Sequence, residues 1–320
     1  MNDNTIGRIF TLTTFGESHG EAIGGIIDGC PSKLKIDFDL LASEMRRRAT
    51  GQAEYDSQRK EADQVDFLSG ILDGITLGTP IAFVVRNNDA RSEDYEAFKH
   101  VYRPSHADFT YQQKFGIRDW RGGGRASART MLPVVVAGAI AKQLLNERNI
   151  FIESNPVISA DLDALRKEGD TIGGIVECVI HGLPAGLGAP MFHKFQADLA
   201  QAMFSIPAVK GFEYGDGFDM AHRRGSEVND AFVCEDGRIR TSTNHSGGIQ
   251  GGITNGENVD FRLAFKPIAS IAQAQQTVTE TGEPCTIQIK GRHDVCAVPR
   301  ALVLVESLAA MVCVDHLLMR

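Results

Sequence analysis

Two long segments that are apolar around their whole circumference most constrain how this chain can fold. Between Pro299 and Leu318, and again between Val134 and Leu145, apolar residues occupy nearly every helical face. A helix that is apolar on every side must be covered on every side by the rest of the protein. The longest uninterrupted apolar run, Pro133–Ala141, is shorter than the roughly 18 residues that a membrane span needs. Both segments are therefore predicted to be core helices.

Around these helices the sequence predicts several short strands. Apolar runs bounded by Gly, Asn or Pro occur at Ala22–Asp28, Thr79–Val85, Gly173–His181 and Asn258–Phe265. Helices are predicted at Phe38–Arg48, Arg125–Glu147, His193–Met203 and Pro299–Leu318. Inside a helix Pro133 would remove a hydrogen bond at a cost of about 3 kcal/mol, so a kink or a helix start is expected there. Since the strands are not separated regularly by helices, an α+β sandwich is favoured over a doubly wound parallel sheet.

The chain shows no sign of division into domains. Its 320 residues would suit about two domains at roughly 150 residues each. However, it contains no Ser- or Pro-rich tract, no block of like charge and no repeat of fixed period. An apolar content of 42% and a charged content of 23% are typical of a folded globular protein. We therefore predict a single domain over residues 1–320.

Charge, cysteines and the N-terminal sequence narrow the class of protein. With 33 Lys plus Arg against 41 Asp plus Glu, the net charge of −8 argues against nucleic-acid binding through an overall basic surface. Met1–Asn4 has no basic stretch followed by an apolar one, as a secretory signal would. The six Cys include no C-x-x-C pair, which argues against a zinc ribbon or a disulfide framework. These features predict a cytoplasmic protein with no nucleic-acid or membrane partner and no metal site.

The segment from Arg118 to Arg129 carries the strongest chemical signal. It holds four Arg and three consecutive Gly in an acidic protein. Gly allows backbone N–H groups to approach a ligand closely, and guanidinium groups suit phosphate oxygens. A helix beginning near Ala126 would add its N-terminal N–H groups and would place Arg125 and Arg129 on one face. An anion site, most simply for phosphate, is favoured over a solvated loop whose Arg residues pair with surface carboxylates.

Several other polar residues are candidates for chemistry. His19 and His106 lie in loop-like surroundings and could exchange protons near neutral pH, although a structural role is open for each. Ser18-His19 and Ser105-His106 are not interpreted as hydrolase dyads, because neighbouring residues are expected to point apart. Asp294, just before the last predicted helix, is either a base or base-orienting group or one half of an ion pair.

A second basic cluster and the search for nucleotide-binding fingerprints give weaker evidence about function. Arg46–Arg48 is a second basic cluster, which either binds an anion or simply complements the dipole at a helix C-terminus. The fingerprints G-x-G-x-x-G and G-x-x-x-x-G-K-[ST] do not occur, and Gly247–Gly252 has neither spacing. A Rossmann dehydrogenase and a P-loop kinase are therefore disfavoured.

Three long motifs make the chain similar to the chorismate synthase family. They are Gly16–Pro31, the stretch from Arg103 to Arg129 with its Gly triplet, and Gly291–Glu306. Shorter motifs fit between them in order: Leu183–Gly188, Val209–Gly211, Gly247–Gly252 and Lys266-Pro267. The resemblance spans nearly the whole chain.

The resemblance implies a fold and a reaction. The fold is a β-α-β sandwich with a central helical layer between two antiparallel sheets, assembled as a homotetramer. The reaction is a lyase step of the shikimate pathway of aromatic amino acid biosynthesis: 5-enolpyruvylshikimate 3-phosphate loses phosphate and a ring proton in a 1,4-elimination that gives chorismate. Reduced FMN is required without net redox change, because the flavin lends electron density to the substrate and its N5 takes the proton. The resemblance also associates the chain with NADP.

The resemblance further implies roles for particular residues. His19 would protonate the departing phosphate, His106 would protonate and stabilise the reduced flavin, and Asp294 would assist proton removal. The residues that correspond to substrate contacts are Ser18, Arg48 and Arg129. The residues that correspond to FMN contacts are Arg125, Ala126, Ser127, Pro207, Ala208, Gly251, Lys266, Pro267, Ile268, Ala269, Ser270 and Arg292. An Arg-rich pocket in an acidic protein suits a substrate with a phosphate and two carboxylates.

The chain departs from the family pattern within these motifs. Glu54 stands where the family has an Arg, while Ala126 and Thr130 replace a hydroxyl and a carboxylate. A carboxylate at position 54 would repel an anionic substrate. The departures motivate an alternative hypothesis: a catalytically impaired relative that binds FMN or an anionic metabolite. A third hypothesis is a phosphoester hydrolase with His19 and His106 around a metal, which predicts phosphate release without flavin.

Overall fold

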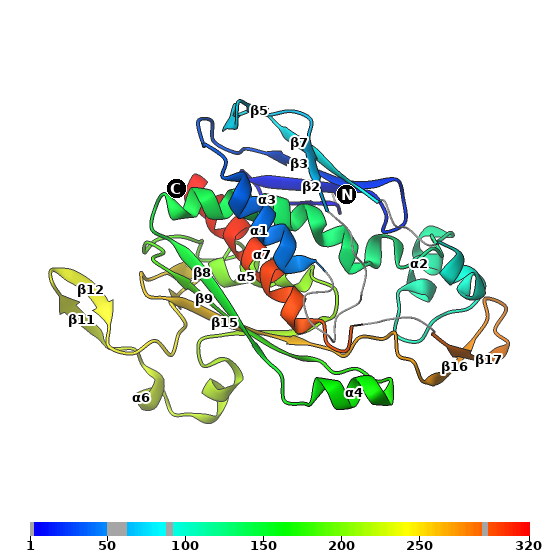
Figure 1. Ribbon diagram of the computed structural model, residues 1–320. Helices are drawn as coiled ribbons and strands as arrows, with labels where there is room; N and C mark the ends of the chain where they lie inside the picture. Colours follow the sequence, from blue (N-terminus) through cyan, green and yellow to red (C-terminus); the bar gives the residue numbers. More distant parts are fainter. Residues whose placement is uncertain (1–2, 50–62, 88–91, 290–293) are drawn as a thin grey trace.

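Two antiparallel sheets lie on either side of a layer of helices (Figure 1). The computed structural model describes residues 3–49, 63–87, 92–289 and 294–320. The first sheet has the order β1-β2-β3-β7-β4, with β1 (Thr5–Ile6), β2 (Thr11–Phe15), β3 (Ala22–Asp28), β4 (Val65–Phe67) and β7 (Ile81–Arg86). The second has the order β10-β15-β9-β8, with β8 (Phe151–Val157), β9 (Gly174–His181), β10 (Val209–Tyr214) and β15 (Val259–Phe265).

Four helices form the layer between the sheets: α1 (Phe38–Arg48), α3 (Leu132–Asn146), α5 (Phe195–Phe204) and α7 (Val298–Leu318). Shorter helices lie outside it: α2 (Asp108–Phe115), α4 (Leu162–Glu168) and α6 (Gly225–Val228). Small hairpins pair β5 (Ile71–Leu72) with β6 (Ile75–Thr76), β11 (Phe232–Glu235) with β12 (Arg238–Thr241), β13 (Ile249–Gln250) with β14 (Ile253–Thr254), and β16 (Ala274–Val278) with β17 (Pro284–Gln288). The predicted α+β sandwich with a central helical layer is confirmed.

The predicted elements agree with the structure except at one helix. The strands β3, β7, β9 and β15 and the helices α1, α5 and α7 lie within two residues of their predicted bounds. The helix predicted from Arg125 is wrong in its first part. Two 3₁₀ turns, Gly124–Ala126 and Ala128–Met131, precede α3, and Ser127 between them has extended backbone (φ −74°, ψ 141°). Pro133 lies in the first turn of α3, where its missing N–H costs no helical hydrogen bond.

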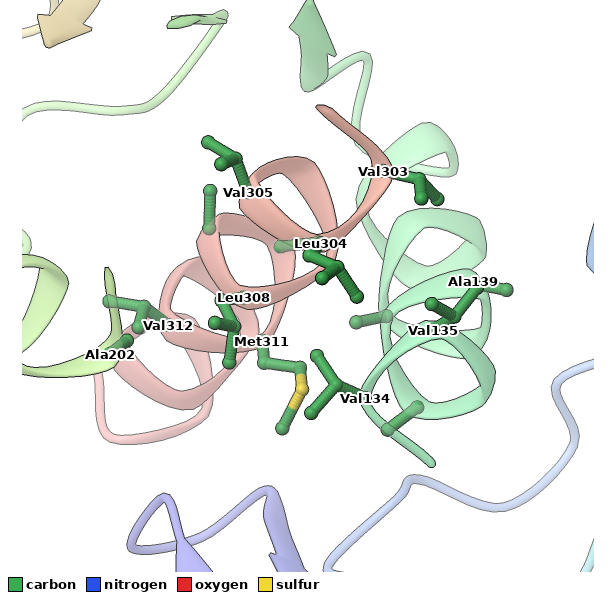
Figure 2. Packing of buried hydrophobic residues seen from close by; sticks show 14 of the residues in the cluster. Val134, Val135, Ala139, Ala202, Val303, Leu304, Val305, Leu308, Met311 and Val312 are labelled. Atoms are coloured by element: carbon green, nitrogen blue, oxygen red, sulfur yellow. The ribbon is translucent and has the colours of Figure 1, made fainter. Parts of the chain in front are cut away.

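The contact between α3 and α7 is the centre of the hydrophobic core. Figure 2 shows Leu304 and Met311 of α7 against Val134 of α3, while Val312 faces Ala202 of α5. One hydrophobic cluster includes buried residues of both sheets and of the helices between them. This continuity supports our proposal that residues 1–320 form one domain.

Two helical segments are long and apolar enough to cross a membrane, judged by length and composition alone. They are Ala128–Asn146 and Val298–Leu318. Of their most apolar windows, 89% and 83% is buried inside this fold. The core helix of a globular protein passes the same test, so the two segments are weak evidence for a membrane.

Replacing Gly138 by Ala is expected to destabilise the contact between α3 and α7. A Cβ atom at this position would lie 2.1 Å from the Cβ of Ser307 and 2.5 Å from its Cα. Because both residues belong to buried helices, the two backbones must move apart, and we expect a loss of about 1–3 kcal/mol in the free energy of unfolding. Urea denaturation measures it. Gly225→Ala is the control, because no atom lies within 4 Å of a Cβ there. Equal effects of the two substitutions would contradict the close approach.

A buried ion network lies within the helical layer. Glu306 of α7 accepts two hydrogen bonds from Arg47 of α1, at 2.6 and 2.7 Å, and one each from Lys142 of α3 and Ser154 of β8, both at 2.6 Å. Glu44 of α1 also pairs with Arg47 and Lys142. Glu306 is 3% exposed. The network therefore joins α1, α3, α7 and the second sheet through one buried carboxylate.

Candidate functional site

A cavity of about 1570 Å³ opens at the end of the helical layer where α7 begins. Its wall is drawn from segments far apart in the chain: Thr14–Glu17, Arg48, residues between Arg103 and Asp108, 117–128, 206–208, 265–270 and residues between Asp294 and Leu304. Pockets for one small ligand are usually about 300–1,000 Å³. This cavity is therefore large enough for two ligands side by side.

The loop of Ser18 and His19 lies directly behind the Gly-rich loop. Gly122 lines the cavity with a φ of 69°, and a Cβ there would lie 2.4 Å from two atoms of the His19 ring. The backbone N–H of Ser18 donates to the carbonyl of Gly124 at 3.4 Å. His19 is 7% exposed and is not itself part of the wall. Because residue 122 has no side chain, His19 packs directly against it, and Gly122 lies between His19 and the cavity.

The expectation that Ser18 and His19 point apart is wrong. Their side chains lie together, with 3.1 Å between Ser18 Oγ and His19 Nδ1. Alternation of neighbouring side chains holds for an extended strand. Here the two residues belong to a turn that follows β2, and the turn brings both side chains to one side.

Buried Arg103 joins the His19 region to the segment that carries the second histidine. Its Nε and Nη2 donate to the two oxygens of Asp108 at 2.8 and 2.7 Å, and Nη2 also donates to the Gly122 carbonyl at 2.8 Å. The guanidinium lies over the ring of Tyr95, which contacts the His19 ring edge-on. This role of Arg103 was missed from the sequence. The only signal was an Arg and an Asp on either side of a loop histidine.

His106 lines the cavity, and its hydrogen bonds assign its tautomer. Nδ1 lies 2.9 Å from the carbonyl of Pro104, which can only accept, so Nδ1 carries the proton. In the neutral ring Nε2 then accepts from the Ser270 hydroxyl at 3.0 Å. Burial, together with the charges of Arg103 and Lys266, lowers the pKa of His106 below its usual range. Burial and these charges therefore favour the neutral imidazole.

Three of the four Arg residues in the Gly-rich segment pair with carboxylates, and Arg118 and Arg121 are two of them. The side chain of Arg118 is 4% exposed, donates to the carbonyls of residues 98, 99 and 101, and pairs with Asp108 at 3.3 Å. Arg121 forms two hydrogen bonds with the carboxylate of Asp119, at 2.8 and 3.0 Å. Both residues pair with carboxylates, as the alternative interpretation expected, but the side chains of Arg118 and Asp108 are buried rather than solvated, and both Arg residues also line the cavity.

Arg125 and Arg129 do not share one helix face, because the extended residue Ser127 separates their 3₁₀ turns. Arg125 lines the cavity and donates to the Gly16 carbonyl at 3.1 Å and to the Thr14 hydroxyl at 2.6 Å. Arg129 is buried outside the wall and donates to Asn87 at 2.6 Å. The prediction that Arg125 and Arg129 lie on one face of a helix is therefore wrong.

Asp63 is a buried carboxylate between two of the predicted substrate-binding residues. It lies 3.2 Å from Arg48 and 3.1 Å from Arg129, and its side chain is 6% exposed. Arg48 lines the cavity, whereas Arg129 and Ser18 do not. No motif in the sequence pointed to Asp63, because its two partners come from α1 and from the turn before α3.

Asp294 lines the cavity and has Arg300 as its partner. Arg300, in the first turn of α7, donates through Nη1 to Asp294 and through Nε to the carbonyl of Arg48 at 3.1 Å. Asp294 thus forms an ion pair with Arg300, a residue that the sequence analysis did not single out, and its expected role as a base or base-orienting group stays a prediction. Arg292 and Glu54, both singled out from the sequence, lie outside the described residues.

Among the described residues, all but one of the predicted FMN contacts line this cavity. The residues on the wall are Arg125, Ala126, Ser127, Pro207, Ala208, Lys266, Pro267, Ile268, Ala269 and Ser270. Gly251, in the turn between β13 and β14, is not part of the wall. The hydroxyl of Thr130, where the family has a carboxylate, donates to the carbonyls of Arg125 and Ser127 and so stabilises the 3₁₀ turns.

The wall has the charge that phosphorylated ligands require. Its basic side chains include Arg48, Arg125, Lys266 and Arg300 in a chain whose net charge is −8. Within the described residues, no group of three or more His, Cys, Asp or Glu has the arrangement of a metal site. Fixed cationic groups at the wall of a cleft attract and orient anions.

The fold and this cavity define an α+β protein with a large cationic pocket. A family model for chorismate synthase matches residues 10–160 and 154–318. The chorismate synthase of Cytophaga hutchinsonii is 49% identical over 350 aligned positions, which cover 98% of this chain and 97% of that protein. The chorismate synthase of Christiangramia forsetii is 50% identical, with 99% and 98% covered. The chain belongs to the chorismate synthase family.

A solved structure agrees with this assignment. A crystal structure of a chorismate synthase matches with a TM-score of 0.76 at 29% sequence identity, covering 98% of this chain and 92% of that chain. The family resemblance inferred from the sequence motifs is confirmed.

Proposed function

We propose that the chain catalyses the 1,4-elimination of phosphate from 5-enolpyruvylshikimate 3-phosphate, giving chorismate with reduced FMN as cofactor. The reaction breaks the C–O bond to phosphate and one ring C–H bond and forms a ring double bond, which makes the protein a lyase. The observation that carries the proposal is the convergence of His106, Asp294, Arg48 and Arg125 on one cavity. These residues come from four separate parts of the chain.

The described residues fit FMN beside a second anion. The cavity of about 1570 Å³ exceeds the range for one small ligand, and Arg125 and Lys266 provide cationic donors on its wall. The segment 266–270 adds a mostly apolar surface that suits a flat ring system. When bound, reduced FMN supplies electron density to the substrate.

The chain's own residues bind the substrate and handle protons. Arg48 holds an anionic group of the substrate at the end of α1. His19, packed behind Gly122, is the group that would protonate the departing phosphate; until it gives up this proton, its imidazolium would offset the growing negative charge. Asp294 assists removal of the ring proton. His106 holds a proton at Nδ1 and exchanges one at Nε2, the ring nitrogen that lies near Ser270.

An anaerobic assay tests the proposal directly. Purified protein is incubated with 5-enolpyruvylshikimate 3-phosphate and reduced FMN, and chorismate and phosphate are measured together. We expect equal amounts of both products, and neither product when FMN is omitted. Flavin binding without phosphate release would support the impaired relative instead. Phosphate release without flavin, blocked by a chelator, would identify the phosphoester hydrolase.

We also propose a cytoplasmic homotetramer, as the family resemblance implies. Large apolar side chains are exposed on the β11–β12 hairpin, where Phe232 and Ile239 are 68% and 75% exposed, and at Phe192, which is 87% exposed. Exposed apolar residues that project from a surface are common in contacts between subunits. Light scattering coupled to size-exclusion chromatography measures the mass of the assembly.

A further inference from the structure

We infer that Arg300 is a positioning residue, which holds Asp294 and the last turn of α1 in one fixed arrangement at the cavity. The inference rests on the proposed function for the role of Asp294. Its structural part, the attachment of α1 to α7 through Arg300, is tested separately below.

The contacts of Arg300 join two parts of the site. Nη1 donates to Oδ2 of Asp294, in the loop before α7, and Nε donates to the carbonyl of Arg48 at 3.1 Å. The side chains of Arg300 and Asp294 are 19% and 14% exposed, so both are largely shielded from water. Because the guanidinium is planar and rigid, its two donors cannot turn independently. A shift of one partner therefore changes the contact with the other.

The carbonyl of Arg48 explains why this contact matters at α1. The last four carbonyls of a helix have no partner within that helix. Arg300 donates a hydrogen bond to one of them. It also places a positive charge at the C-terminus of α1, where the helix dipole of α1 favours a cation. The Arg48 side chain is held separately by Asp63 at 3.2 Å. Arg300 therefore fixes the backbone from which the substrate-binding side chain extends.

Arg300 acts on geometry more than on substrate affinity. Both described hydrogen bonds of its guanidinium go to protein groups and not to the open cavity. Losing them leaves the charge of the wall but removes the contact of Asp294 with Arg300. Misplacing a reacting group by about 1 Å can cost about 10²-fold in rate. Arg300→Lys keeps the positive charge but replaces the planar two-donor fork by a single ammonium group, so it separates geometry from charge.

For Arg300→Lys we expect kcat to fall by about 10- to 100-fold with KM changed by less than about threefold. A substrate deuterated at the carbon that loses the proton should show a larger kinetic isotope effect in the variant, because C–H cleavage becomes the slow step. Arg262→Lys is the matched control. Arg262 lies on β15 outside the cavity wall and pairs with Glu213 at 2.8 Å, so its variant should behave as wild type.

Hydrogen exchange provides a readout that does not depend on turnover. The backbone amides at the C-terminal end of α1, residues 45–49, should exchange faster in Arg300→Lys than in the wild-type protein. In Arg262→Lys they should exchange at the wild-type rate. Arg300→Gln, checked for folding by circular dichroism, should give the same increase if the Lys variant is poorly folded.

Three results for Arg300→Lys would overturn the inference. A raised KM with unchanged kcat and isotope effect would make Arg300 a substrate-binding residue. Wild-type kinetics, or unchanged hydrogen exchange in α1, would show that Arg300 does not position the site. Absence of chorismate from the wild-type protein would reject the proposed function instead. The exchange measurement would then still decide whether Arg300 holds α1.

Discussion

His106→Ala should slow chorismate formation by about 10²-fold or more, as loss of a group that exchanges protons with reacting atoms usually does. The substitution removes the one described imidazole on the cavity wall, together with its hydrogen bonds to Pro104 and Ser270. Single-turnover measurement under anaerobic conditions, with reduced FMN in excess, reports the chemical step. His100→Ala is the control, because the side chain of His100 is 73% exposed and pairs only with Glu280 among the described contacts.

The protonation of His106 supplies a second check on the same residue. Burial and the charges of Arg103 and Lys266 lower its pKa in the ligand-free protein. An anion bound in the cavity favours the charged imidazolium, so the pKa should rise when FMN binds. Nuclear magnetic resonance of the ring protons follows this titration. A near-wild-type rate in His106→Ala, or a pKa that does not respond to FMN, would remove His106 from the mechanism.

Glu306→Gln is expected to destabilise the fold by about 3–5 kcal/mol. The substitution removes the carboxylate that accepts hydrogen bonds from Arg47, Lys142 and Ser154 inside the helical layer. Without Glu306, the two cations Arg47 and Lys142 share the single carboxylate of Glu44, which leaves one positive charge of the network uncompensated. Chemical denaturation at pH 7 measures the loss. Glu153→Gln, on neighbouring strand β8 with a side chain 74% exposed, should change the stability by less than about 0.5 kcal/mol.

The effect of Glu306→Gln should also depend on pH. Burial would raise the pKa of Glu306, but its hydrogen bond from Arg47 and the charge and hydrogen bonds of Lys142 and Ser154 lower it overall. A carboxyl group whose pKa is lower in the folded state stabilises the fold fully above its ordinary pKa of about 4.3. This stabilisation is lost as the pH falls through the lowered value. The difference between wild type and variant should therefore be constant from pH 6 to 8 and shrink below about pH 4; an equal difference at all pH values would contradict the ion network.

The candidate site residues on the cavity wall were accessible from the sequence, whereas the groups that hold them were not. His106, Asp294, Arg48 and Arg125 lie on one cavity, as the motifs predicted. Their motifs are continuous in sequence and carry the residue types that anion chemistry needs. The partners of these residues come from other elements, so no local pattern indicates them. Arg300 and the Arg48 carbonyl that it contacts are 252 residues apart.

The Gly-rich segment shows where a local interpretation fails. Four Arg in one stretch suggested a single anion site, yet Arg118 and Arg121 pair with carboxylates, and Arg129 lies buried beside Asp63. Only Arg125 has the predicted position without a carboxylate partner among its described hydrogen bonds. Arg118, Arg121 and Arg125 all line the cavity, but the sequence did not indicate which of these guanidinium groups pair with carboxylates.

The amino-acid order was enough to determine the layered α+β architecture. Helices that are apolar on every side can be stable only between covering layers, and the short strands supply those layers. The tertiary structure alone decided which guanidinium groups pair with carboxylates and which carboxylates these are. The physical reason is range: hydrophobic patterning acts along each element and is visible in its own residues, while a hydrogen bond or ion pair requires atoms of separate elements to meet within a few ångströms.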